Sequence, residues 1–270
     1  MSKKTHQQQL AARKAKRQAE REAERRRQRR NVGITVTTIA LVVVVVVGAF
    51  LVFGVGGDDE PAASTVPLAP APTRATPLPA EVNCTYKKSS EPAAKKVNPP
   101  ADGETKASGT SKVDLNTSIG ELQLTLDSAL APCTVKNFLS LVSQKYFDDT
   151  KCHRLTTGAG LQVLQCGDPT GTGSGGPGYS FADEVFPTLK YGRSTLAMAN
   201  SGPNTNGSQF FIVYGDASGL TPQYTAFGTI DEAGLKLIDK VAEAGVDPQN
   251  GPDDGAPKTP VEIKSATSAA

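Results

Sequence analysis

Residues 198–211, MANSGPNTNGSQFF, connect two segments that are predicted as β-strands, at 194–199 and 209–214. Short apolar or alternating segments recur on both sides of this stretch. One of them, ELQLTL within 120–126, alternates apolar and polar residues as a half-buried strand does. The further predicted strands are 112–117, 120–126, 151–155, 162–166, 226–230 and 260–264. So many short strands indicate a mainly β domain.

Two helices are predicted beside these strands. The first follows Pro132 and the second covers 232–243, and each places four apolar residues on one face. These residues are Val135, Phe138, Leu139 and Val142 in the first helix, and Leu235, Leu237, Ile238 and Val241 in the second. Short strands with two helices predict a closed β-barrel that is capped at its ends.

Three parts of the sequence together resemble the cyclophilin family of peptidyl-prolyl cis-trans isomerases. They are MANSGPNTNGSQFF itself, CHRL at 152–155 and LQCGDPTGTGSGGPGYSFADE at 164–184. The resemblance spans roughly residues 111–265 and implies a closed eight-stranded antiparallel β-barrel with two helices. It also implies an enzyme that rotates X–Pro bonds of proline-containing polypeptides, with no cofactor and no metal.

The resemblance assigns roles to individual residues. Arg154 matches the arginine that points into the substrate groove, and Gln165 matches a glutamine of that groove. Asn200 matches the asparagine whose backbone pairs with the substrate, and Phe211 matches the floor of the proline pocket. These four are the expected catalytic residues. The expected substrate-binding residues are Val163, Gln209, Leu220 and Tyr224.

The chain also departs from the family pattern. Ten residues separate Arg154 from Gln165, where typical members have fewer. The usual pocket phenylalanine is absent, with Leu161 or Gln162 closest to its place, and Gly219 stands where eukaryotic members often carry tryptophan. Because the four expected catalytic residues are all present, an isomerase is favoured. The alternative is a low-turnover prolyl-binding chaperone or an adaptor on the same fold.

Two other motifs point to different chemistry, and neither is supported by its context. Residues 171–176 fit G-x-G-x-x-G, but Asp168-Pro169 before and Pro177-Gly178 after them exclude the strand and helix that a dinucleotide site needs. A nucleophilic triad lacks its parts, because His153 is the only histidine beyond His6 and no G-x-S-x-G motif is present. The glycine-rich run is therefore expected to be a sharp loop.

The amino-terminal part of the chain has a different composition. Residues 1–30 carry a net charge of +9, so the remainder carries −7, which gives no electrostatic case for nucleic acid. The interval 32–57 holds 26 residues without a charge, including six consecutive valines. We expect a basic cytoplasmic tail at 1–31 and a transmembrane signal-anchor at 32–57 in the cell membrane, with the monomeric domain outside the cell. A cleaved signal peptide is the alternative.

The remaining intervals are a proline-rich extracytoplasmic linker at 58–110 and a short tail at 266–270. All four cysteines follow the apolar interval, so up to two disulfides are expected, with three pairings open. A zinc site is disfavoured because Cys152 and His153 are adjacent, and adjacent residues on a strand face opposite ways. The resemblance places Cys152 and Cys166 on paired strands and thereby favours that bridge, with Cys84–Cys133 as its companion.

Overall fold

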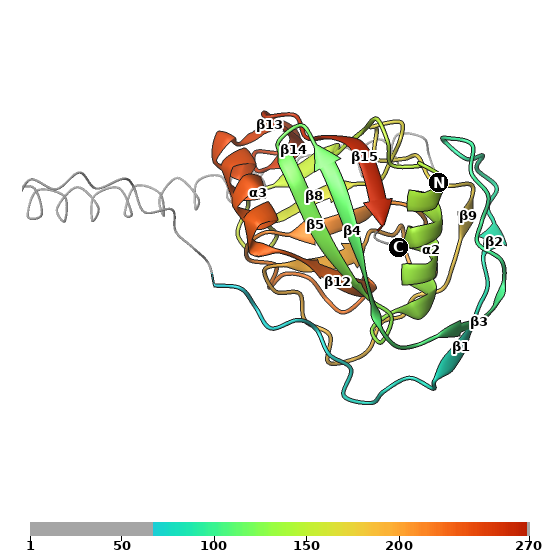
Figure 1. Ribbon diagram of the computed structural model, residues 1–270. Helices are drawn as coiled ribbons and strands as arrows, with labels where there is room; N and C mark the ends of the chain where they lie inside the picture. Colours follow the sequence, from blue (N-terminus) through green and yellow to red (C-terminus); the bar gives the residue numbers. More distant parts are fainter. Residues whose placement is uncertain (1–66, 269–270) are drawn as a thin grey trace, which may run out of the picture. The chain divides into compact units, whose positions relative to one another are not determined.

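An antiparallel sheet of eleven strands organises the computed structural model, which describes residues 67–268 (Figure 1). The sheet strands are β4 (Thr110–Thr117), β5 (Gly120–Asp127), β6 (Thr150–Lys151), β7 (Arg154–Thr156), β8 (Val163–Cys166), β10 (Thr195–Met198), β11 (Phe210–Val213), β12 (Ala226–Ile230), β13 (Val246–Gly251), β14 (Asp254–Pro257) and β15 (Glu262–Ser268). Their spatial order is β13-β14-β7-β8-β11-β10-β12-β5-β4-β15-β6. The prediction of a mainly β domain is therefore confirmed.

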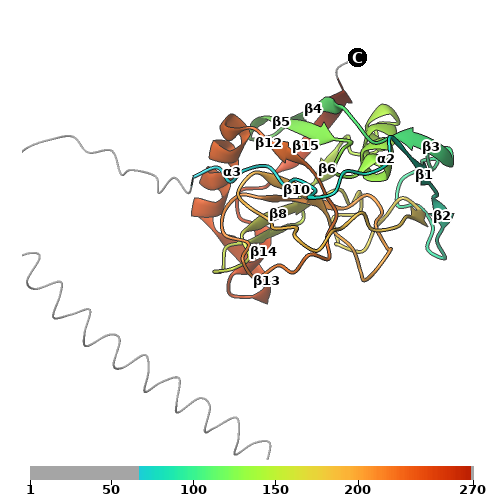
Figure 2. The same ribbon diagram turned by 90° about the horizontal axis from the view of Figure 1, so that it is seen from below.

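Both predicted helices are present, as α2 (Pro132–Ser143) and α3 (Glu232–Ala244). Proline suits the first turn of α2 because the amide hydrogen that it lacks would have no partner there. The carboxylate of Asp231 caps α3 by accepting a hydrogen bond from the amide of Gly234 at 2.9 Å. The two helices lie at opposite ends of the sheet (Figures 1 and 2).

The expected closed barrel of eight strands is corrected by the strand order. The eleven-stranded sheet ends at β13 and at β6, so the described residues do not form a closed ring of eight hydrogen-bonded strands. Only Cys152 and His153 separate β6 from β7, yet β6 pairs with β15 whereas β7 pairs with β8 and β14. The chain therefore passes from the neighbour of β15 to the neighbour of β8 and β14 at these two residues. No hydrogen-bonded strand pair joins the two ends of the sheet there.

The predicted transmembrane segment at 32–57 lies outside the described residues, as does the basic tail. Within residues 67–268, the structure has no helix with the length and apolar character needed to cross a bilayer.

Successive residues of the strands face two separate apolar clusters. On β11, Phe210 and Ile212 belong to the main core, and Phe211 and Val213 belong to a second, smaller cluster. The alternation follows from the two-residue period of a strand. The second face of the sheet therefore carries a cluster of its own, and the candidate site is built there.

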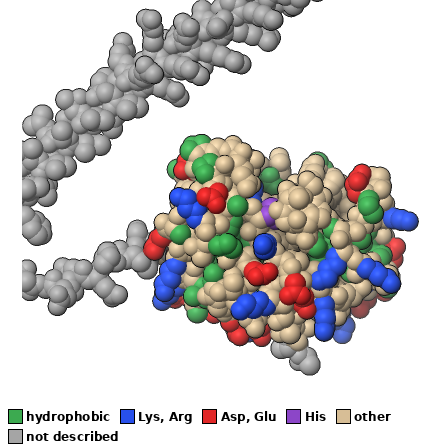
Figure 3. Space-filling model, turned by 90° about the horizontal axis from the view of Figure 1, so that it is seen from above, with side chains coloured by type: hydrophobic (Ala, Val, Ile, Leu, Met, Phe, Trp, Pro, Cys, Tyr) green, Lys and Arg blue, Asp and Glu red, His purple; other side chains and the backbone are tan. Residues whose placement is uncertain are grey.

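The surface of the domain carries both signs of charge. On the face that Figure 3 shows, acidic and basic side chains are interspersed and do not gather by sign. This face offers no single-sign patch of the kind that binds a nucleic-acid backbone.

The described part of the expected linker is not a free spacer. Residues 67–109, here called the N-terminal arm, run along the domain and contain β1 (Glu81–Cys84), β2 (Lys87–Lys88) and β3 (Gly103–Lys106) (Figures 1 and 2). β1 pairs with β3, and β2 pairs with β9 (Tyr179–Ser180) of the domain. The composition predicted extended chain, and the arm is extended, but specific contacts hold it against the domain.

One anchor of the arm is Arg74. Its guanidinium donates hydrogen bonds to the carbonyl oxygens of Leu130 at 2.8 Å and Glu184 at 2.5 Å, and lies 4.8 Å from the centroid of the Phe186 ring. Nearby, the arm approaches so closely that a Cβ on Gly192 would collide with the Cβ of Ala69. The absence of a side chain at position 192 is therefore a condition for this contact.

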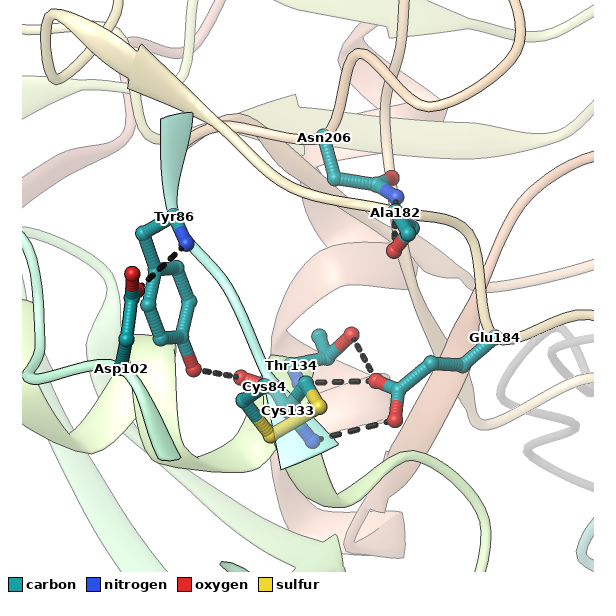
Figure 4. Close-up of a disulfide and its surroundings, with 8 residues drawn as sticks. All are labelled: Cys84, Tyr86, Asp102, Cys133, Thr134, Ala182, Glu184 and Asn206. Atoms are coloured by element: carbon teal, nitrogen blue, oxygen red, sulfur yellow. Dashed lines mark hydrogen bonds between the residues drawn. A yellow bond between two sulfur atoms is a disulfide. The ribbon is translucent and has the colours of Figure 1, made fainter. Parts of the chain in front are cut away.

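A second anchor is the disulfide Cys84–Cys133, which joins the arm to the first turn of α2 (Figure 4). Beside it, the hydroxyl of Tyr86 donates to the carbonyl of Cys133 at 2.8 Å. Ala131 offers α2 no side-chain cap, and the carboxylate of Glu184 takes that role by accepting from the amides of Cys133 and Thr134 at 3.0 and 2.8 Å. Burial raises the pKa of Glu184, while the hydrogen bond from the Thr134 hydroxyl opposes the shift.

The other disulfide is Cys152–Cys166, which joins the segment before Arg154 to the end of β8. No free cysteine is present among residues 67–268. The two pairs that the structure forms are the two that the resemblance favoured.

Candidate active site

Three of the four expected catalytic residues lie in a row across neighbouring strands. Arg154 on β7 is paired with Gln165 on β8, and Gln165 is paired with Phe211 on β11. The row continues from Phe211 to Ala197 on β10 and Ala226 on β12. Directly opposite residues of antiparallel strands project on the same side, so antiparallel pairing alone brings the row together.

Hydrogen bonds link Arg154 and Gln165 of this row to two further side chains, Asp254 and Gln209. These four residues are here called the polar row. Arg154 donates from Nε and Nη2 to the two carboxylate oxygens of Asp254, at 2.8 Å each. Its Nη1 donates to Oε1 of Gln165 at 3.0 Å, and Gln165 donates in turn to Oε1 of Gln209 at 2.9 Å. The side-chain position of Arg154 is therefore fixed from two directions.

The guanidinium keeps donors for a ligand. Arginine has five N–H groups, and the bonds to Asp254 and Gln165 use three of them, which leaves one on each terminal nitrogen. The side chain of Arg154 is 31% exposed, so a ligand can reach these donors. The hydrogen bond to Asp254 raises the pKa of Arg154 and lowers the pKa of Asp254.

Beside the polar row lies the second apolar cluster, here called the aromatic cluster after the rings of Phe211, Tyr191 and Tyr224. Phe211 and Tyr224 meet edge to face with their centroids 5.6 Å apart, and Tyr191 lies 6.4 Å from Phe211. Other members are Val163, Leu189, Ala197, Val213, Ala217 and Ala226, with Leu161, Val185, Phe186, Ala199 and Leu220 packed against them. Three of the expected substrate-binding residues, Val163, Leu220 and Tyr224, therefore lie here.

Asn200 follows β10 and begins the loop that leads to Gln209. Its side chain donates to the carbonyl of Gln223 at 2.9 Å and accepts from the amide of Gly202 at 3.2 Å. Its own backbone N–H and C=O have no hydrogen-bond partner within residues 67–268. They are available to an extended chain that lies along this edge.

Two of the departures from the family pattern, the longer segment after Arg154 and the glycine at 219, are parts of one structural feature. The longer segment after Arg154 places the carbonyl of Gly160 where it accepts from the amide of Gly219 at 2.9 Å, and a Cβ on Gly219 would lie 2.8 Å from that oxygen. A large side chain at 219 is therefore incompatible with this segment. Leu161 packs on the aromatic cluster, whereas Gln162 turns away to accept from the amide of Asp216.

The glycine-rich run forms a sharp loop, as expected, and residues 171–178 are called the glycine loop below. The buried carboxylate of Asp168 accepts hydrogen bonds from the loop amides of Gly173 at 2.7 Å and Gly175 at 3.0 Å. Burial alone would raise the pKa of Asp168, but these bonds and that of Thr170 lower it. The loop also contacts the polar row, because Gln209 donates to the carbonyl oxygens of Gly173 and Gly175.

His153 lies beneath the glycine loop, and a Cβ on Gly173 would lie 3.4 Å from its ring. Both ring nitrogens are buried, and neither has a partner within the described residues. Burial lowers the pKa of this histidine, and the nearby charge of Asp168 opposes the shift. His153 contacts the loop and is not part of the polar row.

Sequence reasoning missed two members of the site. Asp254 comes from the β13–β14 hairpin, which was not predicted, although the segment 250–253, Asn-Gly-Pro-Asp, is rich in residues that favour turns. Tyr191 lies in an irregular segment, where no periodicity marks it as part of an apolar cluster.

Residues 112–268 match the model of the cyclophilin type peptidyl-prolyl cis-trans isomerase family. A Cryptosporidium parvum cyclophilin type isomerase is 34% identical, with a TM-score of 0.52 over 60% of this chain and 99% of that one. A structure of the same protein in the presence of the dipeptide Ala-Pro has a TM-score of 0.51.

Two curated relatives are more similar in sequence. The "Probable peptidyl-prolyl cis-trans isomerase B" of Mycobacterium leprae is 51% identical over 197 residues, and its Mycobacterium tuberculosis counterpart is 48% identical over 197 residues. Both matches cover 68% of this chain, and the chain spans 66% and 63% of the two relatives. The 68% of this chain that each match covers is more than residues 112–268 make up, and only two residues follow position 268. The similarity therefore extends into the N-terminal arm.

Proposed function

The chain belongs to the cyclophilin type peptidyl-prolyl cis-trans isomerase family, and from this premise we propose that it catalyses cis–trans rotation about X–Pro bonds of polypeptides. The observation that carries the proposal is the row of Arg154, Gln165 and Phe211 across three paired strands. It sets free guanidinium donors beside an apolar aromatic cluster. A related isomerase whose structure was determined in the presence of Ala-Pro supports proline-containing chains as the substrates.

The chemistry asks for no nucleophile and no proton transfer. Rotation breaks the amide resonance, and its barrier is about 18–20 kcal/mol. When the bond is half rotated, the proline nitrogen becomes pyramidal and gains a lone pair that accepts a hydrogen bond. A free N–H of Arg154 supplies that bond, and it forms fully only in the twisted state. Such differential binding is what accelerates a reaction.

The other groups hold the chain while the bond turns. The aromatic cluster contacts the proline ring, and the unpaired backbone groups of Asn200 bind the flanking residues. Asp254 and Gln165 keep the guanidinium in place, so its ordering is complete before the substrate arrives.

The test is isomerisation of a proline tetrapeptide by the full chain, followed by exchange NMR because that method needs no coupled protease. Catalysis by the parent chain that depends on Arg154 supports the proposal. A parent chain that binds proline peptides and leaves their exchange rate unchanged would instead indicate a prolyl-binding module.

One observation favours that binding module as the second candidate. Arg154 already forms a bidentate ion pair with Asp254, and an arginine so held offers the twisted amide fewer donors than a free one. A catalytic rate that falls in Asp254→Asn favours the isomerase, in which Asp254 positions Arg154. A rate that rises in this variant favours the binding module, in which Asp254 takes up the donors of Arg154.

We also propose that the enzyme acts outside the cell membrane on exported polypeptides, as a monomer anchored through residues 32–57. The support is the +9 charge before this uncharged interval, together with the two disulfides that follow it. Structural disulfides persist in oxidising compartments and are rare in the cytosol.

Protease treatment of intact cells tests this location. A domain outside the membrane is released or degraded while a cytosolic marker stays intact. A domain that survives until the cells are lysed would refute the location and leave the isomerase proposal untouched.

A further inference from the structure

A cavity of about 830 Å³ lies between the N-terminal arm and the glycine loop. Three parts of the chain line it: Ser89 with residues 91–94 of the arm, the glycine loop, and the site residues Gln165, Asn200 and Gln209. Two of these residues, Gln165 and Gln209, belong to the polar row. The cavity therefore adjoins the candidate site and is not a separate pocket elsewhere on the domain.

The arm wall of this cavity is fixed at both ends. Ser89 donates its backbone N–H to the carbonyl of Gly178 at 3.0 Å, and Ala94 donates to the carbonyl of Gly176 at 2.9 Å. Gly178 has a φ of +80°, and a Cβ there would lie 2.8 Å from the backbone nitrogen of Ala93. This close approach makes the arm and the glycine loop two sides of one built cavity.

Under the proposed function, a bound polypeptide reaches this cavity from the candidate site. The chain that flanks the proline lies along Asn200, whose backbone groups are unpaired, and Ala199, Asn200 and Ser201 also line the cavity. Extended chain advances about 3.3–3.6 Å per residue, so a residue close to the proline enters the cavity.

The cavity has one fixed charge. Among the described residues that line it, Glu91 alone has a charged side chain, and this side chain is exposed. The neighbouring lysines of the arm, Lys87 and Lys88, do not line it. Lys95 is engaged elsewhere, because its ammonium donates to the carbonyl oxygens of Lys145 and Asp148.

We propose that the arm segment 89–94 adds an outer wall to the substrate cavity beside the polar row, and that Glu91 determines specificity by favouring a basic side chain close to the proline. The inference rests on the proposed isomerase function and adds a preferred substrate class to it: polypeptides with Lys or Arg near an X–Pro bond. The family domain at 112–268 does not supply this wall, because the arm precedes it.

The experiment compares peptides with Lys, Glu or Ala at each of the two positions before and the two positions after the proline. Exchange NMR with the full chain gives kcat/KM and Kd for each peptide. In Glu91→Gln we expect the Lys-to-Glu ratio of kcat/KM to fall about two- to fivefold at one or more positions, with a larger fall in Glu91→Lys. The effect fades at high salt, because the charges are exposed.

Glu81→Gln is the matched control, since Glu81 is an exposed glutamate of the same arm that does not line the cavity. We expect the Lys-to-Glu ratio of this variant to equal that of the parent. An active parent whose ratio is unchanged in Glu91→Gln at all four positions would overturn this role of Glu91. Absence of catalysis on every peptide would refute the isomerase proposal instead, and the ratio of Kd values then decides on the role of Glu91.

Discussion

The candidate site has two sides that treat the substrate differently. The polar row is held by directional hydrogen bonds, and in the proposed mechanism it offers its free donors to an atom that accepts them only in the twisted state. The aromatic cluster is held by packing, and in the proposed mechanism it contacts the proline ring in either isomer. Interactions that differ between ground state and transition state change kcat, whereas uniform ones change KM. Substitutions on the two sides should therefore separate in their kinetics.

The largest effect is expected for Arg154→Ala, which removes the donor to the twisted amide. We expect kcat/KM to fall about 10²–10³-fold, mostly through kcat, by analogy with the loss of one preorganised donor. Arg154→Lys should recover only part of the rate, because an ammonium lacks the planar fork. Exchange NMR on a proline tetrapeptide gives the rates, with Lys151→Ala as an exposed control nearby. A folded Arg154→Ala chain as fast as the parent would remove Arg154 from the mechanism.

A smaller effect with the opposite kinetic pattern is expected for Phe211→Leu. The substitution keeps an apolar side chain and loses the edge-to-face contact with Tyr224, and such aromatic contacts contribute about 0.5–1.5 kcal/mol. We expect KM to rise about two- to tenfold with kcat nearly unchanged. Phe211→Ala would add a stability loss of about 3–5 kcal/mol, because the ring is buried. A fall in kcat alone would contradict the division of roles between the two sides.

Asp254→Asn tests the ion pair that holds Arg154, and a several-fold fall in kcat is expected. The hydrogen bond from Arg154 lowers the pKa of Asp254 in the folded chain. The stability that the ionised Asp254 gives the folded chain is therefore present above the unfolded pKa of about 3.9, and it is lost as the pH falls through the lower folded pKa. Urea unfolding between pH 2.5 and 7 should show less loss below about pH 4 in Asp254→Asn than in the parent. Equal acid sensitivity of both chains would exclude this pair as a source of stability.

The smallest effect is expected for His153, which lies outside the polar row. Burial lowers its pKa, so the unfolded chain binds a proton at a higher pH than the folded chain does. Stability should therefore decrease as the pH falls below about 6.5, the ordinary pKa of histidine, toward the lowered folded value. His153→Gln should flatten this part of the profile in urea unfolding and leave kcat at neutral pH unchanged. A parent profile without a slope between pH 5 and 6.5 would contradict it.

Most strands of the sheet could be predicted from the sequence because strand residues signal their environment locally. On β11 the alternation of Phe210, Phe211, Ile212 and Val213 between two clusters follows from the period of a strand. The row of Arg154, Gln165 and Phe211 then follows from antiparallel pairing. The resemblance supplied the roles of these residues, which no local pattern could give.

The rest depended on contacts between distant positions. Asp254 meets Arg154 through the β13–β14 hairpin, and Arg74 meets carbonyl groups of two separate loops. No apolar period marks residues 67–80, so their sequence predicted extended chain and not the surface against which it packs. The barrel expectation failed at Cys152 and His153, where the chain changes partner strands without any turn residue to announce it.

The contact between Ala69 and Gly192 makes the sequence of the domain depend on the presence of the arm. Position 192 lies within the family domain, and a Cβ there would collide with Ala69 of the arm. No atom of the domain itself would collide with this Cβ. Relatives that carry the arm are expected to keep glycine at this position, and relatives without the arm are free to vary it. The residue at 192 should therefore vary only where this contact is missing, and a side chain at 192 would mark a lineage without the contact even in a fragment of sequence that lacks the arm.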